Sequence, residues 1–205
     1  MSRPLIMLAS ASPRRSELLR QIGVAHEVQP VSVDEAMLPE EVPADYVSRV
    51  ACSKAETLWE QLRDAQCLPV LGSDTAVVLG HRVFGKPRNR GDAMRMLQDL
   101  SGCVHEVYTA VALRHSAGID VRVNVSEVTF RELTRAEIEW YWRSGEPLDK
   151  AGAYAVQGLA AMFISRITGS YSGIMGLPLY ETAELLALAG LTPLRSADTD
   201  NNNCQ

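Results

Sequence analysis

The sequence predicts an α/β protein built on a mixed β-sheet. Short apolar runs that suit buried strands alternate along the chain with segments whose apolar residues recur at helical spacing. Two strand segments also follow one another with no helix between them, which favours a mixed sheet. The 205 residues contain neither an internal repeat nor a Pro/Gly-rich linker. We therefore expect one domain over residues 1–195, followed by a disordered tail at 196–205.

The first strand and the first helix are predicted from residues 5–23. Residues 5–8 form a continuous apolar run, as in a buried strand. Ser12 and Pro13 suit the N-cap and the first position of a helix, and Gly23 suits its C-cap. The stretch LASASPRRSELL therefore spans a strand-to-helix turn.

The other elements follow from apolar patterns and turn residues. Thr134 and Glu137 have the spacing of a capping box and open one helix, and Gly80-His81 suits a tight turn between two strands. A Gly-Ser turn at 72–73 is expected between two shorter strands. Further helices are predicted at 44–63, 91–100 and 178–189, and strands at 69–71, 75–79, 104–113, 119–130 and 161–167.

Composition and charge exclude several classes of protein. Hydrophobic residues make up 46% of the chain and charged residues 22%, as in a soluble globular protein with a real core. The net charge of −5 argues against non-specific binding to nucleic acid or a membrane surface. No apolar run approaches a membrane span, and the first residues do not resemble a signal peptide. None of the four cysteines has C-x-x-C spacing, so we expect reduced thiols, no zinc site and a cytoplasmic location.

The turn after the first strand has the chemistry of an anion site. The N-terminus of a helix exposes unpaired N–H groups at the positive end of its dipole. Ser10 and Ser12 add hydroxyl donors, and Arg14 and Arg15 add planar guanidinium groups that suit phosphate oxygens. The alternative is a capped helix with two solvated arginines, and this turn taken alone favours that alternative, since exposed arginines in a first helical turn are common.

Three charged residues further along the chain stand out against their surroundings. Lys54 lies on the apolar stripe of its helix, where it either reaches the solvent or meets a ligand at the floor of a cleft. Asp74 follows an apolar strand, and Lys86 ends the predicted hairpin. A turn-forming aspartate and a solvated lysine are the alternatives for these two.

The glycine-rich segment AGAYAVQG allows a backbone to approach a ligand closely. Gln157 within it carries an amide that can both donate to and accept from a nucleobase edge. The alternative is a glycine-rich loop with no ligand. Together with the cations and with the carboxylates of Glu35 and Asp74, this segment supplies what a nucleotide phosphohydrolase needs.

These motifs, taken in order, resemble the Maf family of nucleotide pyrophosphatases from about residue 5 to residue 186. The matching pieces are LASASPRRSELL, Asp34-Glu35, SKAE, GSDT with GKP, LSG with HEVYTAVAL, EPLDKAGAYAVQG and GSYSGIMGLPLYET. One departure is Ser73, where the family pattern has alanine. The resemblance implies an elongated mixed sheet flanked by helices with a central cleft, similar to inosine triphosphate pyrophosphatases.

The resemblance also implies an activity and a site. Maf proteins hydrolyse nucleoside triphosphates to the monophosphate and pyrophosphate with a divalent cation, here Mg²⁺ or Mn²⁺ at Glu35 and Asp74. Asp74 is the proton acceptor of the family pattern. The implied phosphate-binding residues are Ser10, Ser12, Arg14 and Arg15, the catalytic cluster is Glu35, Lys54, Asp74 and Lys86, and the specificity positions are Arg14, Thr75 and Gln157.

The loop with Gln157 resembles the subfamily that acts on dTTP and UTP, since the subfamily for 7-methyl-GTP carries a different loop. A pyrophosphatase for 7-methyl-GTP or another modified nucleotide is one alternative. A non-catalytic nucleotide-binding regulator of septum formation is another. The resemblance further suggests a homodimer, with a nucleoside triphosphate as the small-molecule partner.

Overall fold

The computed structural model describes residues 5–62 and 68–191. It contains one seven-stranded mixed sheet in the order β2-β1-β3-β5-β6-β7, with β4 paired to β3. Its strands are β1 (Ile6–Leu8), β2 (His26–Val28), β3 (Val70–Leu79), β4 (Arg82–Phe84), β5 (Val104–His115), β6 (Gly118–Phe130) and β7 (Ile164–Thr168).

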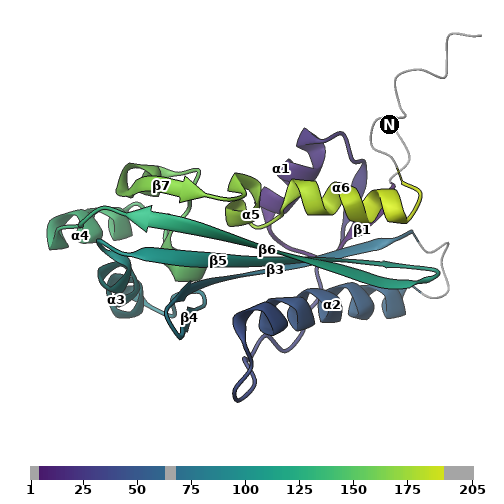
Figure 1. The fold of residues 1–205 in the computed structure, drawn as a ribbon, viewed down its shortest axis with the longest axis horizontal. Coiled ribbons are helices and arrows are strands. Elements are labelled where there is room, and N and C mark those ends of the chain that lie inside the picture. The colour runs from purple at the N-terminus through teal and green to yellow at the C-terminus, as the bar shows by residue number, and fades with distance from the viewer. Residues whose placement is uncertain (1–4, 63–67, 192–205) are drawn as a thin grey trace, which may run out of the picture.

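Helices cover both faces of this elongated sheet. Figure 1 shows α2 on one side of the long strands and α1, α5 and α6 on the other. The helices are α1 (Pro13–Gln21), α2 (Pro43–Gln61), α3 (Arg90–Leu100), α4 (Arg135–Arg143), α5 (Tyr171–Met175) and α6 (Leu179–Leu188), with 3₁₀ turns η1 (Ala151–Ala153) and η2 (Leu159–Phe163). The α/β class and the mixed sheet are thus confirmed.

The sheet is parallel only near its N-terminal strands. Strand β1 pairs in parallel with β2 and with the start of β3. All other pairs are antiparallel, and β5 and β6 form a long hairpin. The predicted helices at 44–63, 91–100 and 178–189 agree with α2, α3 and α6 to within two residues. The capping box of Thr134 and Glu137 is present at the start of α4.

The predicted interruption of β3 is wrong. Gly72, Ser73 and Asp74 continue the strand and pair with residues of β5. The strand tolerates them because Gly72 lies under α2, where a side chain would not fit, and the buried Ser73 hydroxyl donates to the carbonyl of Gly176 at 3.0 Å. The polar residues of GSDT are therefore satisfied inside the sheet rather than exposed in a turn.

The predicted strand at 161–167 begins too early. Residues 159–163 form the 3₁₀ turn η2, and β7 starts at Ile164. The amide of Ala161 donates to the carbonyl of Gly158, so a local hydrogen bond takes the place of a ladder bond. Two short elements, β2 and α5, were not predicted, because three and five residues are too few to show a period.

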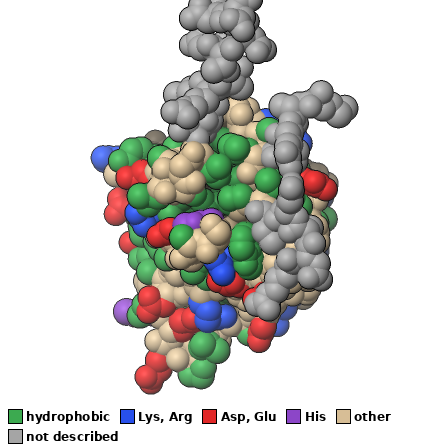
Figure 2. Space-filling view, turned by 90° about the vertical axis from the view of Figure 1, so that its right-hand side faces the viewer, with side chains coloured by type: hydrophobic (Ala, Val, Ile, Leu, Met, Phe, Trp, Pro, Cys, Tyr) green, Lys and Arg blue, Asp and Glu red, His purple; other side chains and the backbone are tan. Residues whose placement is uncertain are grey.

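The core consists of three apolar clusters. One packs α2 onto the sheet, one lies between the sheet and helices α1 and α6, and one surrounds α3, α4 and the ring of Phe130. The face drawn in Figure 2 mixes basic, acidic and hydrophobic side chains among the described residues. Within those residues no helix is long and apolar enough to cross a membrane. The predicted tail at 196–205 lies outside the described part of the chain.

The contact between α2 and β3 predicts a stability cost at Gly72. A Cβ atom at this position would lie 2.2 Å from the carbonyl oxygen of Ala51 in α2. Gly72→Ala should therefore lower the free energy of unfolding by about 1–3 kcal/mol in urea denaturation. Gly85→Ala is the matched control, since a Cβ there meets nothing within 4 Å. Equal stability of the two variants would contradict the close approach.

Candidate active site

A cavity of about 680 Å³ opens where the β1–α1 turn, α2, β3 and the segment before η2 meet. All ten of the site residues predicted from the sequence line it, although they come from six separate stretches of the chain. They are Ser10, Ser12, Arg14, Arg15, Glu35, Lys54, Asp74, Thr75, Lys86 and Gln157. The structure therefore brings together every residue of the expected site.

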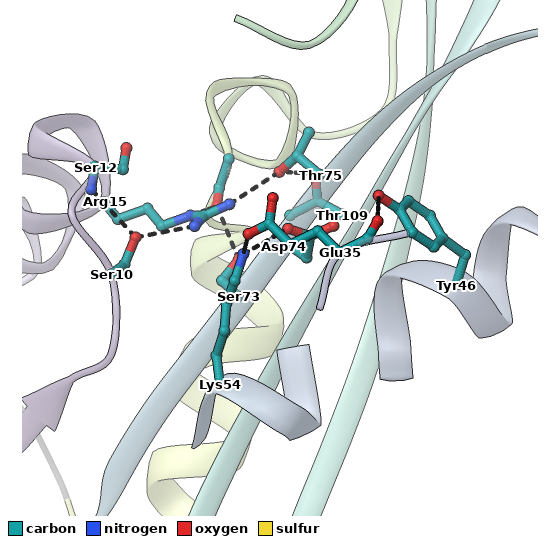
Figure 3. Close-up of polar contacts among 11 residues, drawn as sticks. Ser10, Ser12, Arg15, Glu35, Tyr46, Lys54, Ser73, Asp74, Thr75 and Thr109 are labelled. Atoms are coloured by element: carbon teal, nitrogen blue, oxygen red, sulfur yellow. Dashed lines mark hydrogen bonds and ion pairs between the residues drawn. The ribbon is translucent and has the colours of Figure 1, made fainter. Parts of the chain in front are cut away.

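Lys54 is the centre of the site. Its side chain is 10% exposed and does not reach the solvent. The ammonium Nζ lies 2.8 Å from Asp74 Oδ1 and 2.6 Å from Glu35 Oε1, so one cation bridges two carboxylates (Figure 3). A buried charge is tolerated when it is paired in this way. This position favours the reading that places Lys54 at the floor of a cleft, and its contact with a phosphate stays a prediction.

The two carboxylates differ in their surroundings. Asp74 is buried in β3, whereas Glu35 lies in the exposed segment before α2. Partial burial by itself raises the pKa of Glu35, but the hydrogen bond and charge of Lys54, with the charges of Lys86 and Arg15, outweigh it and lower that pKa. Glu35 is therefore ionised at neutral pH.

Arg15 is fixed by the protein itself. Its Nε donates to the carbonyl of Gly176 at 2.8 Å, its Nη1 to Ser10 Oγ at 3.0 Å and its Nη2 to Thr75 Oγ1 at 3.4 Å. These bonds use three of the five N–H donors of a guanidinium and leave two for a ligand. Burial lowers the pKa of Arg15 from its ordinary value, although the charge of Asp74 opposes that effect.

Arg14 is more open to the cavity than Arg15. Only its Nε has a hydrogen-bond partner among the described residues, the carbonyl of Met175 at 3.3 Å. Its terminal Nη groups are thus available to an anion. The reading of LASASPRRSELL as a helix with two solvated arginines is wrong, because both guanidinium groups bond to the chain near residue 175.

The start of α1 faces the same cavity. Ser12 occupies the N-cap position and Pro13 the first helical position, as predicted. However, the Ser12 hydroxyl makes no capping hydrogen bond and has no other partner within residues 5–62 and 68–191, which leaves it available to a ligand. The unpaired N–H groups of the first turn add positive character at this point. This end of the cavity therefore has the features of a phosphate site.

The glycine-rich segment forms the opposite wall. Gly152 adopts φ = 66°, a conformation that favours glycine, and its amide donates to the carbonyl of Gly85 at 3.1 Å. The ring of Tyr154 lines the cavity, and its hydroxyl lies 2.9 Å from His105 Nε2. Burial lowers the pKa of His105 to about 4, so this histidine is neutral at physiological pH.

Sequence reasoning missed four contributors to the cavity wall. Lys150 and Tyr154 line it, and the carbonyls of Met175 and Gly176 hold the two arginines. A lysine directly before a glycine-rich segment is a signal that could have marked Lys150. The carbonyls carry no such signal, since any residue type supplies one.

The acidic side chains fit a cation that a substrate helps to hold. Within residues 5–62 and 68–191 there is no group of three or more His, Cys, Asp or Glu residues arranged for a metal ion. Glu35 and Asp74 each use one carboxylate oxygen to contact Lys54 Nζ, which leaves the other oxygen of each for a cation beside that lysine. Mg²⁺ is commonly bound by one or two carboxylates together with substrate phosphates. The donor set therefore suits Mg²⁺ or Mn²⁺ in company with a phosphate ligand.

Comparison with known proteins gives a consistent result. The family model described as "Maf-like protein" matches residues 5–189. A "dTTP/UTP pyrophosphatase" of Bordetella avium is 53% identical over 194 residues, which cover 92% of this chain and 96% of that protein. One of Nitrosomonas europaea, with the same name, is 50% identical over 197 residues, covering 91% and 95% of the two chains.

A search of solved structures found a "Nucleoside-triphosphatase / dITP/XTP pyrophosphatase" from Mycobacterium abscessus. The two sequences are 20% identical, the aligned part covers 61% of this chain and 72% of that protein, and the TM-score is 0.34. A likeness this weak has no bearing on the fold or the function of the present chain.

The bridging contacts predict how Glu35 titrates. Lys54→Met removes both the hydrogen bond and the positive charge of Lys54, leaving burial opposed only by the charges of Lys86 and Arg15 at Glu35. The pKa of Glu35 should lie below its ordinary value in the wild type and rise in this variant, as measured by NMR titration of its side-chain carboxyl. Lys86→Met should cause a smaller rise, because Lys86 acts through charge alone. An unchanged pKa in Lys54→Met would contradict the bridge.

Proposed function

The chain belongs to the Maf family, and on that premise we propose that it hydrolyses dTTP and UTP to the nucleoside monophosphate and pyrophosphate. The observation that carries the proposal is the bridge from Lys54 to Glu35 and Asp74 at the floor of a cavity lined by further cations. Relatives that share about half of their residues with this chain over nearly its whole length bear the same name.

The charges of the cavity suit a triphosphate. Although the protein carries a net charge of −5, the cavity is lined by five basic side chains against three acidic ones. Cations aimed at phosphate oxygens stabilise the charge that develops on a departing pyrophosphate. In our proposal the basic residues Arg14, Arg15, Lys54, Lys86 and Lys150 take this part, and Ser10, Ser12 and the start of α1 hold the phosphate oxygens.

The reaction proposed is in-line attack of water on the α-phosphorus. A bond forms between the water oxygen and the α-phosphorus while the bond from that phosphorus to the bridging oxygen breaks. Asp74 accepts the proton of the water. Among the described residues, Lys54 contacts only Oδ1 of Asp74, which leaves Oδ2 to take the proton. A divalent cation bound by Glu35 and Asp74 would neutralise phosphate charge and lower the pKa of water.

Base selection is assigned to the opposite wall. The Gln157 side chain is exposed to the cavity and has no hydrogen-bond partner among the described residues, so its amide is free to pair with a pyrimidine edge. Arg14 and Thr75 are the other two positions that we propose for substrate choice. A site built around such bonds rejects bases that leave them unpaired. The homodimer and the cytoplasmic location remain predictions.

The substrate assignment predicts the outcome of a nucleotide panel. Purified protein with Mg²⁺ is offered dTTP, UTP, CTP, 7-methyl-GTP and ITP, and pyrophosphate is measured against orthophosphate. We expect pyrophosphate, with dTTP and UTP the preferred substrates. Preference for another nucleotide would overturn the assignment to dTTP and UTP, and nucleotide binding without any product would favour the regulator.

Asp74→Asn should lower kcat by about 10²- to 10⁴-fold, because an amide cannot take up the proton of the attacking water. Thermal unfolding should show that the fold persists, since the amide oxygen can still accept from Lys54. Asp99→Asn is a matched control that removes only a surface ion pair with Arg82. Turnover comparable to wild type in Asp74→Asn would remove this residue from the role of base.

A further inference from the structure

The position of Gln157 depends on the backbone that carries it. Because no described residue pairs with its side-chain amide, no side-chain contact fixes where that amide points. Its place is set by the loop of residues 154–160, which follows η1 and includes the first two residues of η2. A side chain that distinguishes bases by its hydrogen bonds must be held to within a fraction of an ångström of its productive position. The contacts that hold this loop therefore matter for base selection.

Glu146 holds the far side of the loop. Its carboxylate accepts hydrogen bonds from the backbone amide of Leu159 at 2.8 Å and from that of Ala160 at 3.2 Å. These amides lie two and three residues after Gln157. A carboxylate that accepts two neighbouring amides is a strong, charge-assisted anchor.

Tyr141 links Glu146 to the near side of the loop. Its hydroxyl donates to Glu146 Oε1 at 2.8 Å and accepts from the amide of Ala155 at 3.2 Å. The ring is fully buried and meets Phe163 edge to face, with ring centroids 5.2 Å apart. Burial, then the hydrogen bond to Glu146, raises the pKa of Tyr141, so its hydroxyl stays protonated and remains a donor.

Gly158 makes room for this arrangement. A Cβ atom at position 158 would lie 2.2 Å from Glu146 Oε2 and 2.4 Å from Oε1. The backbone of Gly158 has a negative φ of −109°, so a side chain here would act by displacing the Glu146 carboxylate and not by straining the backbone. The carboxylate of Glu146 therefore packs directly against the backbone next to Gln157.

We propose that Tyr141 and Glu146 act as a clamp that positions Gln157 for base selection. This inference rests on the proposed function. The clamp bonds to backbone amides on both sides of Gln157, at Ala155 and at Leu159-Ala160. Neither clamp residue lines the cavity or contacts Lys54, Glu35 or Asp74, so the clamp acts through the loop. The charge of Glu146 also acts on Lys150, whereas the Tyr141 hydroxyl is uncharged, so Tyr141→Phe tests the clamp without changing the charge near the phosphates.

The clamp is tested by the ratio of kcat/KM for dTTP to kcat/KM for CTP. In Tyr141→Phe and Glu146→Gln this ratio should fall about tenfold, mainly through a higher KM for dTTP, while kcat changes little. The matched control is Glu139→Gln on the same helix, where Glu139 makes only surface ion pairs. A merely structural role would lower kcat/KM for dTTP and for CTP by the same factor. An unchanged ratio of the two would therefore overturn the clamp.

A double-mutant cycle tests whether the clamp acts through Gln157. Gln157→Ala alone should abolish most of the discrimination between dTTP and CTP. Adding Tyr141→Phe to Gln157→Ala should then lower the ratio no further, since the positioned group is already absent. Full additivity of the two losses would overturn the clamp, because it would mean that Tyr141 acts on the substrate by another route.

Hydrogen exchange separates the clamp from the substrate assignment. In Glu146→Gln and in Gly158→Ala, the amides of Ala155, Leu159 and Ala160 should exchange faster than in the wild type, with β5 and β6 unchanged. Unaltered exchange at these amides overturns the clamp whatever the activity. A wild type that hydrolyses none of the nucleotides overturns the proposed function, and with it the role of the clamp in base selection, even where exchange confirms its hydrogen bonds.

Discussion

The close approach of α2 to β3 is the constraint on which the site depends. Helix and strand come together at Gly72, where the backbone of the strand nearly touches the carbonyl of Ala51. Lys54 follows one turn later on the same face of α2, and Asp74 follows two residues later on the same face of β3. The packing that builds the core thereby sets the length of the central ion pair. The contacts that stabilise the core therefore also position the charged groups of the site.

The charged groups of the site stabilise one another. Lys54 is balanced by two carboxylates, and Arg15 is held by a carbonyl and two hydroxyl groups. Burial of such groups without partners would cost several kcal/mol each, whereas paired groups are tolerated. The donors are consequently in place before a nucleotide arrives, and little reorganisation is left for the binding step.

Local patterns predicted much of this arrangement, and long-range contacts account for the rest. The helix of Lys54 could be read from its period, and Lys54 itself stood out as a cation on an apolar stripe. The turn of Arg14 and Arg15 was also visible in the sequence. By contrast, the continuous β3 depends on its pairing with β5, and the bond from Arg15 to Gly176 joins residues 161 apart. No local pattern records such partners, and the same holds for Tyr141 and Glu146, which sequence reasoning did not single out.

Because Arg14 and Arg15 are held by the carbonyls of Met175 and Gly176, the site depends on residues that the ribosome adds much later. Both arginines near the N-terminus leave the ribosome long before these carbonyls exist. Until residue 176 has been made and has docked, the guanidinium groups lack their partners and the nucleotide cavity lacks one wall. A chain that ends before residue 175 lacks both carbonyls, so we expect its arginines to be left without these partners and its nucleotide site to be incomplete.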